Sequence, residues 1–195
     1  SKSTLTKRFI VKDIKHEFEV PTLKNPLEEL RVLLNNRSFS INKHNTQTIY
    51  LPLYGIEKKQ KYVFQRSGLN QWNARGRPRH PDEAYIPIPA AIHRQFPDFF
   101  PDRDVSFALK FPDGEKVESS VCQDGSKALM SQSNRKLGKL ILRDILKLKE
   151  GELVTYEKLQ LFGIDSVRID KVGNLKYEIN FAQNNSYELF KDSWR

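Results

Sequence analysis

The sequence predicts an α+β fold with a mainly antiparallel sheet or barrel. Roughly seven strand-like runs and about three short helices follow one another without regular alternation, an order typical of such folds. Two hairpin signals support antiparallel pairing. Pro112-Asp113-Gly114 separates two runs of alternating polar and apolar residues, and Gly173-Asn174 separates two more near the C-terminus.

The first part of the chain is expected to hold two strands and a helix. Residues 1–20 alternate charged and apolar side chains and are expected to be either an entry strand or a linker that leads into the first strand of the domain. A helix is expected after Asn25-Pro26, because leucines recur at helical spacing in LEELRVLLNN and two glutamates occupy the first turn. The β-branched and aromatic run Thr48–Gly55 predicts a strand, and KYVFQRSG from Lys61 predicts another.

The rest of the chain continues with short elements. AYIPIP predicts a strand, and a short helix is expected from near Ala90 until Pro97 stops it. NRKLGKLILRDILKLKEG is the clearest helix, with leucines and isoleucines on one face and cations on much of the rest. A second short helix is expected in VTYEKLQLFGI, before the last hairpin. The tail, AQNNSYELFKDSWR, is polar and is expected to be frayed.

The charge of the chain favours a polyanionic partner. Its 195 residues carry 33 Lys+Arg and 24 Asp+Glu, a formal net charge of +9, which is the electrostatic footprint expected of a DNA or RNA binder. Cys122 is the only cysteine, so no internal disulfide is expected and a reducing cytoplasm fits. No apolar run approaches the roughly 20 residues that span a bilayer. The chain does not begin with Met, and we expect a soluble fragment of a longer protein, without a membrane contact.

The stretch RSGLNQWNARGRPRHPDEAYIPIP, from Arg66 to Pro89, is the strongest candidate for a ligand-binding segment. It carries four arginines and no acidic residue before Asp82. The side chains between the arginines include planar amides and one indole. Asn and Gln bond adenine bidentately, Arg bonds guanine, and all three bind phosphate oxygens. Glycines and prolines exclude a long helix here. The stretch predicts a rigid nucleic-acid-contacting arm anchored by the AYIPIP strand, with a solvated loop as the alternative.

A second polar loop follows the first expected helix. It is either a second contact loop or a solvated connection. Its candidate residues for DNA contact are Arg37, Ser38, Asn42, Lys43 and His44.

No catalytic constellation is visible in the sequence. The four histidines stand in scattered polar contexts without a nucleophile elbow nearby, and a single cysteine cannot supply a zinc site. The phospholipase-D-type His-x-Lys signature and the phosphate-binding G-x-x-x-x-G-K-[ST] loop are absent. The chain is therefore expected to be a non-enzymatic module with no cofactor and no metal. The alternative is an unrecognised metal-dependent nuclease site that uses Asp98, Asp102, Asp104 or Asp113.

Two motifs carry a resemblance to a known family. GLNQWNARGRPRHPDEAYIPIP with the following HRQFPDFFP, and CQDGSKALMS before a Leu-rich helix, resemble the C-terminal recognition domain of BfiI/NgoFVII-type restriction endonucleases, the Neisserial members in particular. The resemblance covers most of the chain from about Gly68 to Phe181. It implies a seven-stranded pseudobarrel with short flanking helices, similar to the plant B3 fold. Such a domain grips the major groove of double-stranded DNA between an N-arm, here about residues 68–80, and a C-arm, here about residues 122–133.

The resemblance also implies how the chain is divided. Residues 1–60 are expected to form an N-terminal extension with the first helix and strand, packed on a DNA-binding pseudobarrel over residues 61–195; one domain over about residues 15–185 is the alternative. The parent protein is expected to be a bacterial, cytoplasmic, site-specific endodeoxyribonuclease of a restriction-modification system. Its phospholipase-D-like nuclease domain is absent from this sequence and is implied to carry the dimer contact, so a monomer is expected here.

The expected DNA-contacting residues follow from the two motifs. Arginines are expected to position the arm on phosphates, with one or two reading guanine, while the amides and Asp124 are expected to read base edges. Trp72 is expected to stiffen the arm, with stacking on a base as the alternative, and Cys122 and Met130 are expected to pack. The N-arm set is Asn70, Gln71, Trp72, Asn73, Arg75, Arg77 and Arg79. The C-arm set is Gln123, Asp124, Gly125, Ser126, Lys127, Met130 and Ser131.

A third class of function stays open from the residues alone. An RNA or single-strand binder would use Trp72 and the tyrosines as stacking platforms. Against it, the aromatic residues recur at strand-like spacing, which favours their packing in a core.

Overall fold

The computed structural model of the chain describes residues 7–8, 19–20, 47–70 and 80–194. The chain divides into two units, residues 1–41 and 42–195. In the first unit, β1 (Lys7–Arg8) pairs antiparallel with β2 (Glu19–Val20). The helix expected after Asn25-Pro26 lies outside the described residues.

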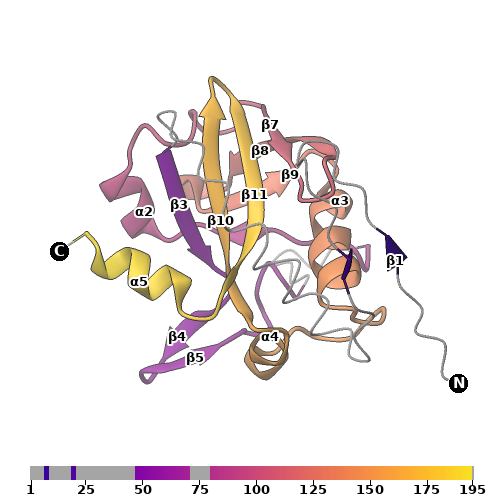
Figure 1. Cartoon of the computed structure of the whole chain (residues 1–195). Coiled ribbons are helices and arrows are strands. Elements are labelled where there is room, and N and C mark those ends of the chain that lie inside the picture. The colour runs from indigo at the N-terminus through magenta and orange to yellow at the C-terminus, as the bar shows by residue number, and fades with distance from the viewer. Residues whose placement is uncertain (1–6, 9–18, 21–46, 71–79, 195) are drawn as a thin grey trace, which may run out of the picture. The chain divides into compact units, whose positions relative to one another are not determined.

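A seven-stranded sheet forms the centre of the second unit (Figure 1). Its order is β3-β10-β11-β7-β8-β9-β6, and the two end strands, β3 and β6, lie in contact, so that the sheet is nearly closed. Neighbouring strands are antiparallel except β11 and β7, which are parallel. The expected α+β seven-stranded pseudobarrel is therefore confirmed, with a mixed sheet. The strands are β3 (Gln47–Pro52), β6 (Ile86–Pro87), β7 (Phe107–Lys110), β8 (Lys116–Cys122), β9 (Ala128–Ser131), β10 (Ile164–Gly173) and β11 (Lys176–Gln183).

Local chemistry explains the two long hairpins. In the β7–β8 turn, the Asp113 carboxylate accepts the Glu115 N–H at 2.8 Å, and Gly114 has a φ of 94°. Only glycine adopts such a φ readily, and a short acidic side chain is suited to closing the turn. The β10–β11 turn lies at Asn174-Leu175, one residue later than expected.

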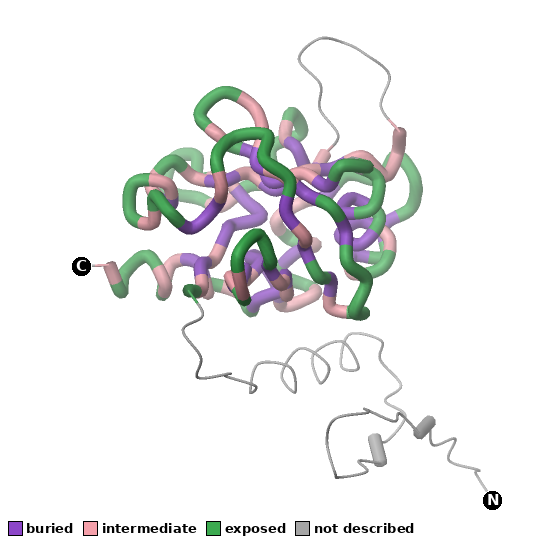
Figure 2. Tube along the Cα trace, turned by 90° about the horizontal axis from the view of Figure 1, so that it is seen from above, coloured by how far each residue is buried: buried purple, intermediate pink, exposed green. Residues whose placement is uncertain are grey.

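An aromatic cluster fills part of the core, where Figure 2 shows the buried positions inside the unit. The Tyr177 ring lies 5.7, 5.7 and 4.7 Å from the ring centroids of Phe99, Phe100 and Phe107. Its hydroxyl donates to the Phe99 carbonyl oxygen at 2.6 Å, and burial raises the pKa of Tyr177 to about 12. Each aromatic pair contributes about 0.5–1.5 kcal/mol beyond the burial of its area.

Short helices flank the sheet. The first of them in the second unit, α2, ends just before Pro97, as expected from the restriction that proline places on the preceding residue. α3 runs on into η2, and this pair buries Leu137 and Ile141 completely. The Thr155 hydroxyl caps α4 by accepting the Lys158 N–H at 3.3 Å. The helices are α2 (Ala90–Gln95), η1 (Asp124–Ser126), α3 (Asn134–Lys139), η2 (Leu140–Ile145), α4 (Tyr156–Phe162) and α5 (Ser186–Asp192).

The strand expected from Lys61 onward is shorter than the sequence suggests. It is limited to β5 (Gln60–Tyr62), which pairs with β4 (Gly55–Glu57) in a separate two-stranded sheet. The turn between them has positive φ at both Lys58 and Lys59. Tight hairpins need that geometry and normally take it from Asn or Gly, whereas here two lysines adopt it.

β9 is a strand that the sequence did not indicate. Residues 128–131 belong to the expected C-arm, and they pair with both β8 and β6. Ala128 and Leu129 are completely buried, so their burial stabilises a strand here despite the polar neighbours.

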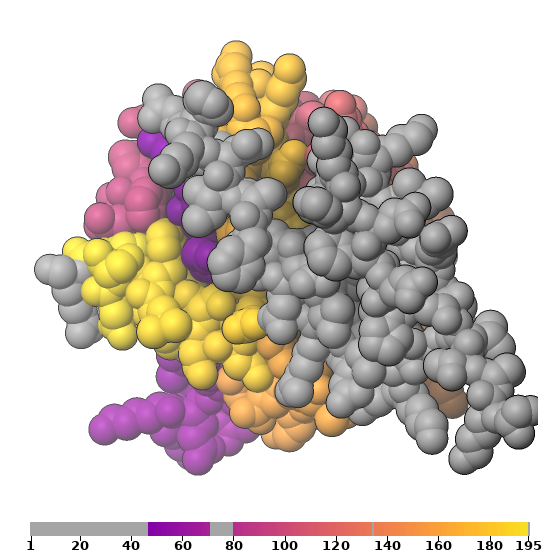
Figure 3. Space-filling model, viewed as in Figure 1, coloured from indigo at the N-terminus to yellow at the C-terminus, as the bar shows by residue number. Residues whose placement is uncertain are grey.

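The expectation of a frayed C-terminal tail is wrong, because residues 186–192 form α5. Glu188 on α5 accepts a hydrogen bond from the Tyr54 hydroxyl and forms an ion pair with Lys61 Nζ at 2.7 Å. Lys61 also contacts the completely buried carboxylate of Asp165 at 3.0 Å. Burial opposes ionisation of Glu188, but the hydrogen bonds from Lys61 and Tyr54 hold its pKa below the ordinary value. The surface of α5 accordingly meets that of the β4–β5 hairpin (Figure 3).

Candidate nucleic-acid interface

The predicted C-arm is the connection between β8 and β9, and its backbone is strained. Gln123 has φ 69° and ψ 166°, a combination that is essentially reserved for glycine. Gly125 and Ser126 follow with φ of 73° and 52°. Such conformations cost of order 1–3 kcal/mol at a residue other than glycine. Here they produce the tight turn η1 and leave the Asp124 side chain fully exposed at its tip.

Neighbouring elements hold the backbone of the C-arm in place. The Ile88 N–H, directly after β6, donates to the Lys127 carbonyl oxygen at 2.8 Å. His93 on α2 places its Nε2 2.9 Å from the Ser126 carbonyl oxygen, and because a carbonyl only accepts, Nε2 carries the proton. Within the arm, the Ser126 N–H donates to the Gln123 carbonyl oxygen at 3.0 Å. The tip is therefore presented from a fixed support.

Arg103 belongs to this surface, although the sequence reasoning missed it. Its Nη1 lies 3.3 Å from Asp124 Oδ1, and its Nε lies 3.2 Å from Asp104 Oδ2. All three side chains are exposed, so these ion pairs are weak and separate easily when another partner competes. The Asp104 N–H donates to the Val121 carbonyl oxygen at 2.9 Å, which holds this loop against the end of β8. No local pattern links Arg103 to a carboxylate 21 residues away.

Three residues of the C-arm are buried or half-buried. Ser131 is buried, and its hydroxyl accepts the Leu137 N–H at 3.2 Å and donates to a carbonyl two residues on, which fixes the start of α3. Cys122 is half-buried with its Sγ 3.0 Å from Ser120 Oγ, and burial raises the pKa of its thiol. Met130 on β9 is half-buried as well. The polar residues at the surface of the β8–β9 turn are Gln123, Asp124, Ser126 and Lys127, and Gln132 and Ser133 are exposed after β9.

Only the two ends of the predicted N-arm belong to the described residues. The predicted contacts of Gln71, Trp72, Asn73, Arg75, Arg77 and Arg79, and of the loop residues Arg37, Ser38, Asn42, Lys43 and His44, lie outside them and stay predictions. Asn70 is described, and its amide pairs with the backbone of Val154. Its Oδ1 accepts the Val154 N–H at 2.7 Å, and its Nδ2 donates to the Val154 carbonyl oxygen at 3.0 Å.

The base of the N-arm closes at Gly68. Its carbonyl oxygen accepts the Tyr85 N–H at 3.3 Å, which joins the outgoing and returning chain. A Cβ at Gly68 would lie 2.2 Å from the Tyr85 ring, so glycine permits this close approach.

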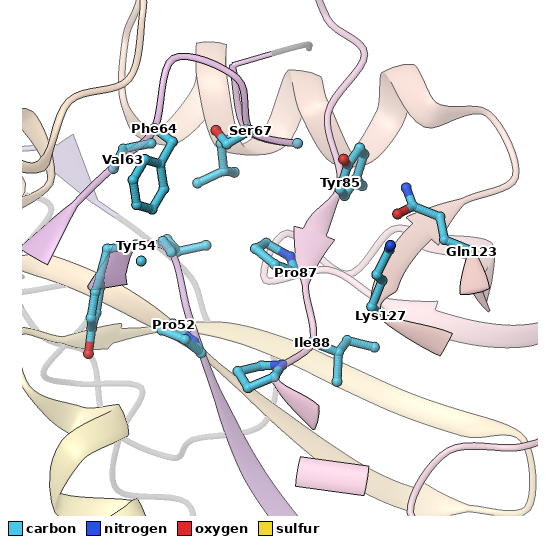
Figure 4. Close-up of a pocket in the computed structure, with 15 residues that line it drawn as sticks. Pro52, Tyr54, Val63, Phe64, Ser67, Tyr85, Pro87, Ile88, Gln123 and Lys127 are labelled. Carbon is cyan, nitrogen blue, oxygen red and sulfur yellow. The ribbon is translucent and has the colours of Figure 1, made fainter. Parts of the chain in front are cut away.

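A cavity of about 400 Å³ separates the C-arm from the base of the N-arm (Figure 4). Gln123 and Lys127 line it from the C-arm, while Phe64, Ser67 and Tyr85 line it from the N-arm side. Prolines and aliphatic side chains form much of the remaining wall. The two segments that the sequence singled out therefore border one hollow with polar groups at its edge.

Within the described ranges, no three His, Cys, Asp or Glu side chains gather into a group that could hold a metal ion. The same ranges contain no helix with the length and apolar character needed to cross a membrane.

Comparison with known proteins gives one family match. Residues 43–173 match the model of a family described as the NgoFVII C-terminal B3-like DNA-binding domain. Among solved structures, a hypothetical protein of Arabidopsis thaliana is similar with a TM-score of 0.35 and 10% sequence identity, over 72% of this chain and 94% of that chain. That similarity is too low to support an inference. No curated protein matches the sequence. The matched range includes both predicted arms and most of the sheet.

Proposed function

Because this chain belongs to the family of the NgoFVII C-terminal B3-like DNA-binding domain, we propose that it binds one short sequence of double-stranded DNA. The N-arm and the C-arm grip the major groove from two sides, and the chain binds as a monomer. The net charge of +9 draws the domain to any duplex, and base contacts from the arms select the sequence.

The geometry of the C-arm supports this function. The C-arm carries backbone strain at Gln123 and presents a fully exposed carboxylate on a fixed support. Such strain is costly in a loop that only connects two strands, and it clusters at functional sites. Asp124 accepts a hydrogen bond from a cytosine amino group, and the Gln123 amide suits adenine. Lys127 binds phosphate as a point charge. The exposed ion pair between Arg103 and Asp124 separates at little cost in free energy when a base competes for the Asp124 carboxylate.

The domain serves as the recognition part of a restriction endonuclease. Its family is a DNA-binding domain, and the resemblance of the two arm motifs to BfiI/NgoFVII-type enzymes supports a parent with a separate phospholipase-D-like nuclease domain. We therefore expect no cut product when this chain alone is incubated with duplex DNA and Mg²⁺. Cleavage under those conditions would favour a nuclease site of its own.

Selection from random duplexes tests the function directly. The chain is incubated with the pool at near-physiological salt, and the bound fraction is sequenced; enrichment of one short motif is expected. A pool bound without enrichment, and released by moderate salt, would mean that only the net charge acts. A parallel selection from random RNA tests the alternative that the chain binds RNA.

Asp124→Asn then tests the C-arm on the selected duplex. Loss of a base-reading group costs about 1–3 kcal/mol, or roughly 5- to 150-fold in Kd, and relaxes the sequence preference at one position. Asp113→Asn is the matched control, because it makes the same charge change in the turn at the opposite end of β8. Equal effects of the two substitutions would exclude a base-reading role for Asp124.

A further inference from the structure

The N-arm returns to the sheet against Arg143 on η2. Its guanidinium donates through Nε to Asp82 Oδ1 at 2.7 Å and through Nη2 to the Pro81 carbonyl oxygen at 2.8 Å. Nη1 donates to the carbonyl oxygens of Leu148 and Lys149 at 2.9 and 2.7 Å. These bonds use four of the five N–H donors that a guanidinium has, and the side chain is only 19% exposed. Arg143 is therefore engaged within the protein, although it is a cation beside a DNA-binding arm.

The outgoing end of the N-arm is held by the same part of the chain. Asn70 pairs in both directions with the backbone of Val154, which is buried, and its Nδ2 also donates to the Phe64 carbonyl oxygen at 3.0 Å. Leu148, Lys149 and Val154 all belong to the connection between η2 and α4, residues 146–155. This one connection thus restrains both ends of the arm, the returning end through Arg143 and the outgoing end through Asn70.

α3 adds a third restraint on the returning end. Gly138 lies so close to the backbone of residues 82–84 that a Cβ there would be 1.8 Å from the Asp82 carbonyl oxygen. Helix and arm backbone are in direct contact, which leaves the returning end no room to shift toward α3.

We propose that Arg143 and Asn70 are positioning residues of the DNA site, which set both ends of the N-arm before DNA arrives and do not themselves touch DNA. Asn70 then holds the arm and does not have the base contact expected from the sequence, because its Oδ1 and Nδ2 are both bonded to backbone groups. The proposal rests on the proposed function. Bonds that fix the two ends of the arm during folding lower the ordering cost of binding. Base reading depends on the exact place of each side chain, whereas phosphate attraction depends on charge. Loosening the ends therefore weakens binding to the preferred sequence far more than binding to other sequences.

Arg143→Lys is the main test. Lysine keeps the charge but cannot reproduce the planar fork of donors that reaches four acceptors. Wild type and variant are titrated with the selected duplex and with a scrambled duplex of equal length over a series of salt concentrations. We expect about a tenfold or greater loss of affinity for the selected duplex, unchanged affinity for the scrambled one, and an unchanged slope of log K against log salt.

Arg168→Lys is the matched control. Arg168 is also a half-buried arginine in an ion pair, with Asp170 on β10 at 2.8 Å. Its replacement is expected to leave both affinities unchanged. A selective loss of affinity in Arg143→Lys then results from the lost contacts of Arg143, and not from replacing a half-buried arginine by lysine in general.

Two results would overturn the proposal. Wild-type affinity of Arg143→Lys for both duplexes would show that the bonds to the arm do not matter for binding. Equal losses on both duplexes would mark Arg143 as a general phosphate contact. If thermal unfolding shows that Arg143→Lys does not fold, Asn70→Ala takes its place with the same expectation and the same overturning results. A wild-type chain without any sequence preference would contradict the proposed function itself, which is a separate outcome.

Discussion

Gly138→Ala measures how tightly α3 packs on the returning end of the N-arm. In a helix interior, the change from glycine to alanine ordinarily stabilises by about 1 kcal/mol. Here the added Cβ would lie 1.8 Å from the Asp82 carbonyl oxygen and 2.7 Å from the Ala84 nitrogen. Because such contacts are essentially never shorter than 3.0 Å, α3 or residues 82–84 must move by more than about 1 Å.

The expected result is a loss of stability despite the better helix former. Overpacking costs about 1–3 kcal/mol, and the upper end applies because no side-chain rotation removes a backbone obstacle. After the helix gain of about 1 kcal/mol, a net loss of about 2 kcal/mol remains. Urea denaturation at pH 7 measures the free energy of unfolding. Lys139→Ala on the same helix is exposed and serves as the control, with an expected change within about 0.5 kcal/mol. A Gly138→Ala protein as stable as wild type would refute the close packing.

Two further predictions concern the C-arm and α5. Gln123→Gly is expected to raise the free energy of unfolding by about 0–2 kcal/mol, because relief of about 1–3 kcal/mol of strain is offset by about 0.4–1 kcal/mol of added entropy of the unfolded chain, while affinity for the selected duplex falls. Urea denaturation and duplex titration measure both, and a destabilised variant would contradict the strained backbone. The lowered pKa of Glu188 means that its stabilisation is present above the ordinary pKa and is lost as the pH falls through the lowered value. Glu188→Gln is therefore expected to lower the melting temperature at pH 7 and to make progressively less difference below about pH 4. Glu178→Gln, which removes an exposed ion pair with Lys110, is the control, and a Glu188→Gln deficit that stays constant with pH would argue against the ionised pair.

Local patterns were sufficient for the elements whose contacts are close in sequence. The Pro112-Asp113-Gly114 turn closes within a few residues through the Asp113 carboxylate and the positive φ of Gly114, so the local sequence was enough to predict the hairpin. Pro97 ends α2 by its effect on the residue before it. At Lys58-Lys59, by contrast, an ordinary residue pair adopts a turn that is usually made by Asn or Gly.

The candidate site was predictable only in part. The CQDGSKALMS motif singled out the β8–β9 connection as the expected C-arm, and Asp124 is exposed at the tip of this connection. The motif did not reveal that its Ser131 is buried at the start of α3. A serine looks the same in a sequence whether its hydroxyl faces solvent or bonds the backbone of a helix. Nor did the motif reveal Arg103, which meets Asp124 only after β7 and β8 have paired.

The sequence by itself determined the charge, the β7–β8 and β10–β11 hairpins, most helices and the motifs of the two expected arms, since each depends on residues that are neighbours or a few positions apart. The tertiary structure decided the parallel pairing of β11 with β7, the docking of α5 and the anchoring of the N-arm. Arg143 and Asp82 are 61 residues apart, and Asn70 and Val154 are 84 apart. Such contacts carry no periodic signal, because they arise where the closed sheet brings distant segments together and buried polar groups must find partners.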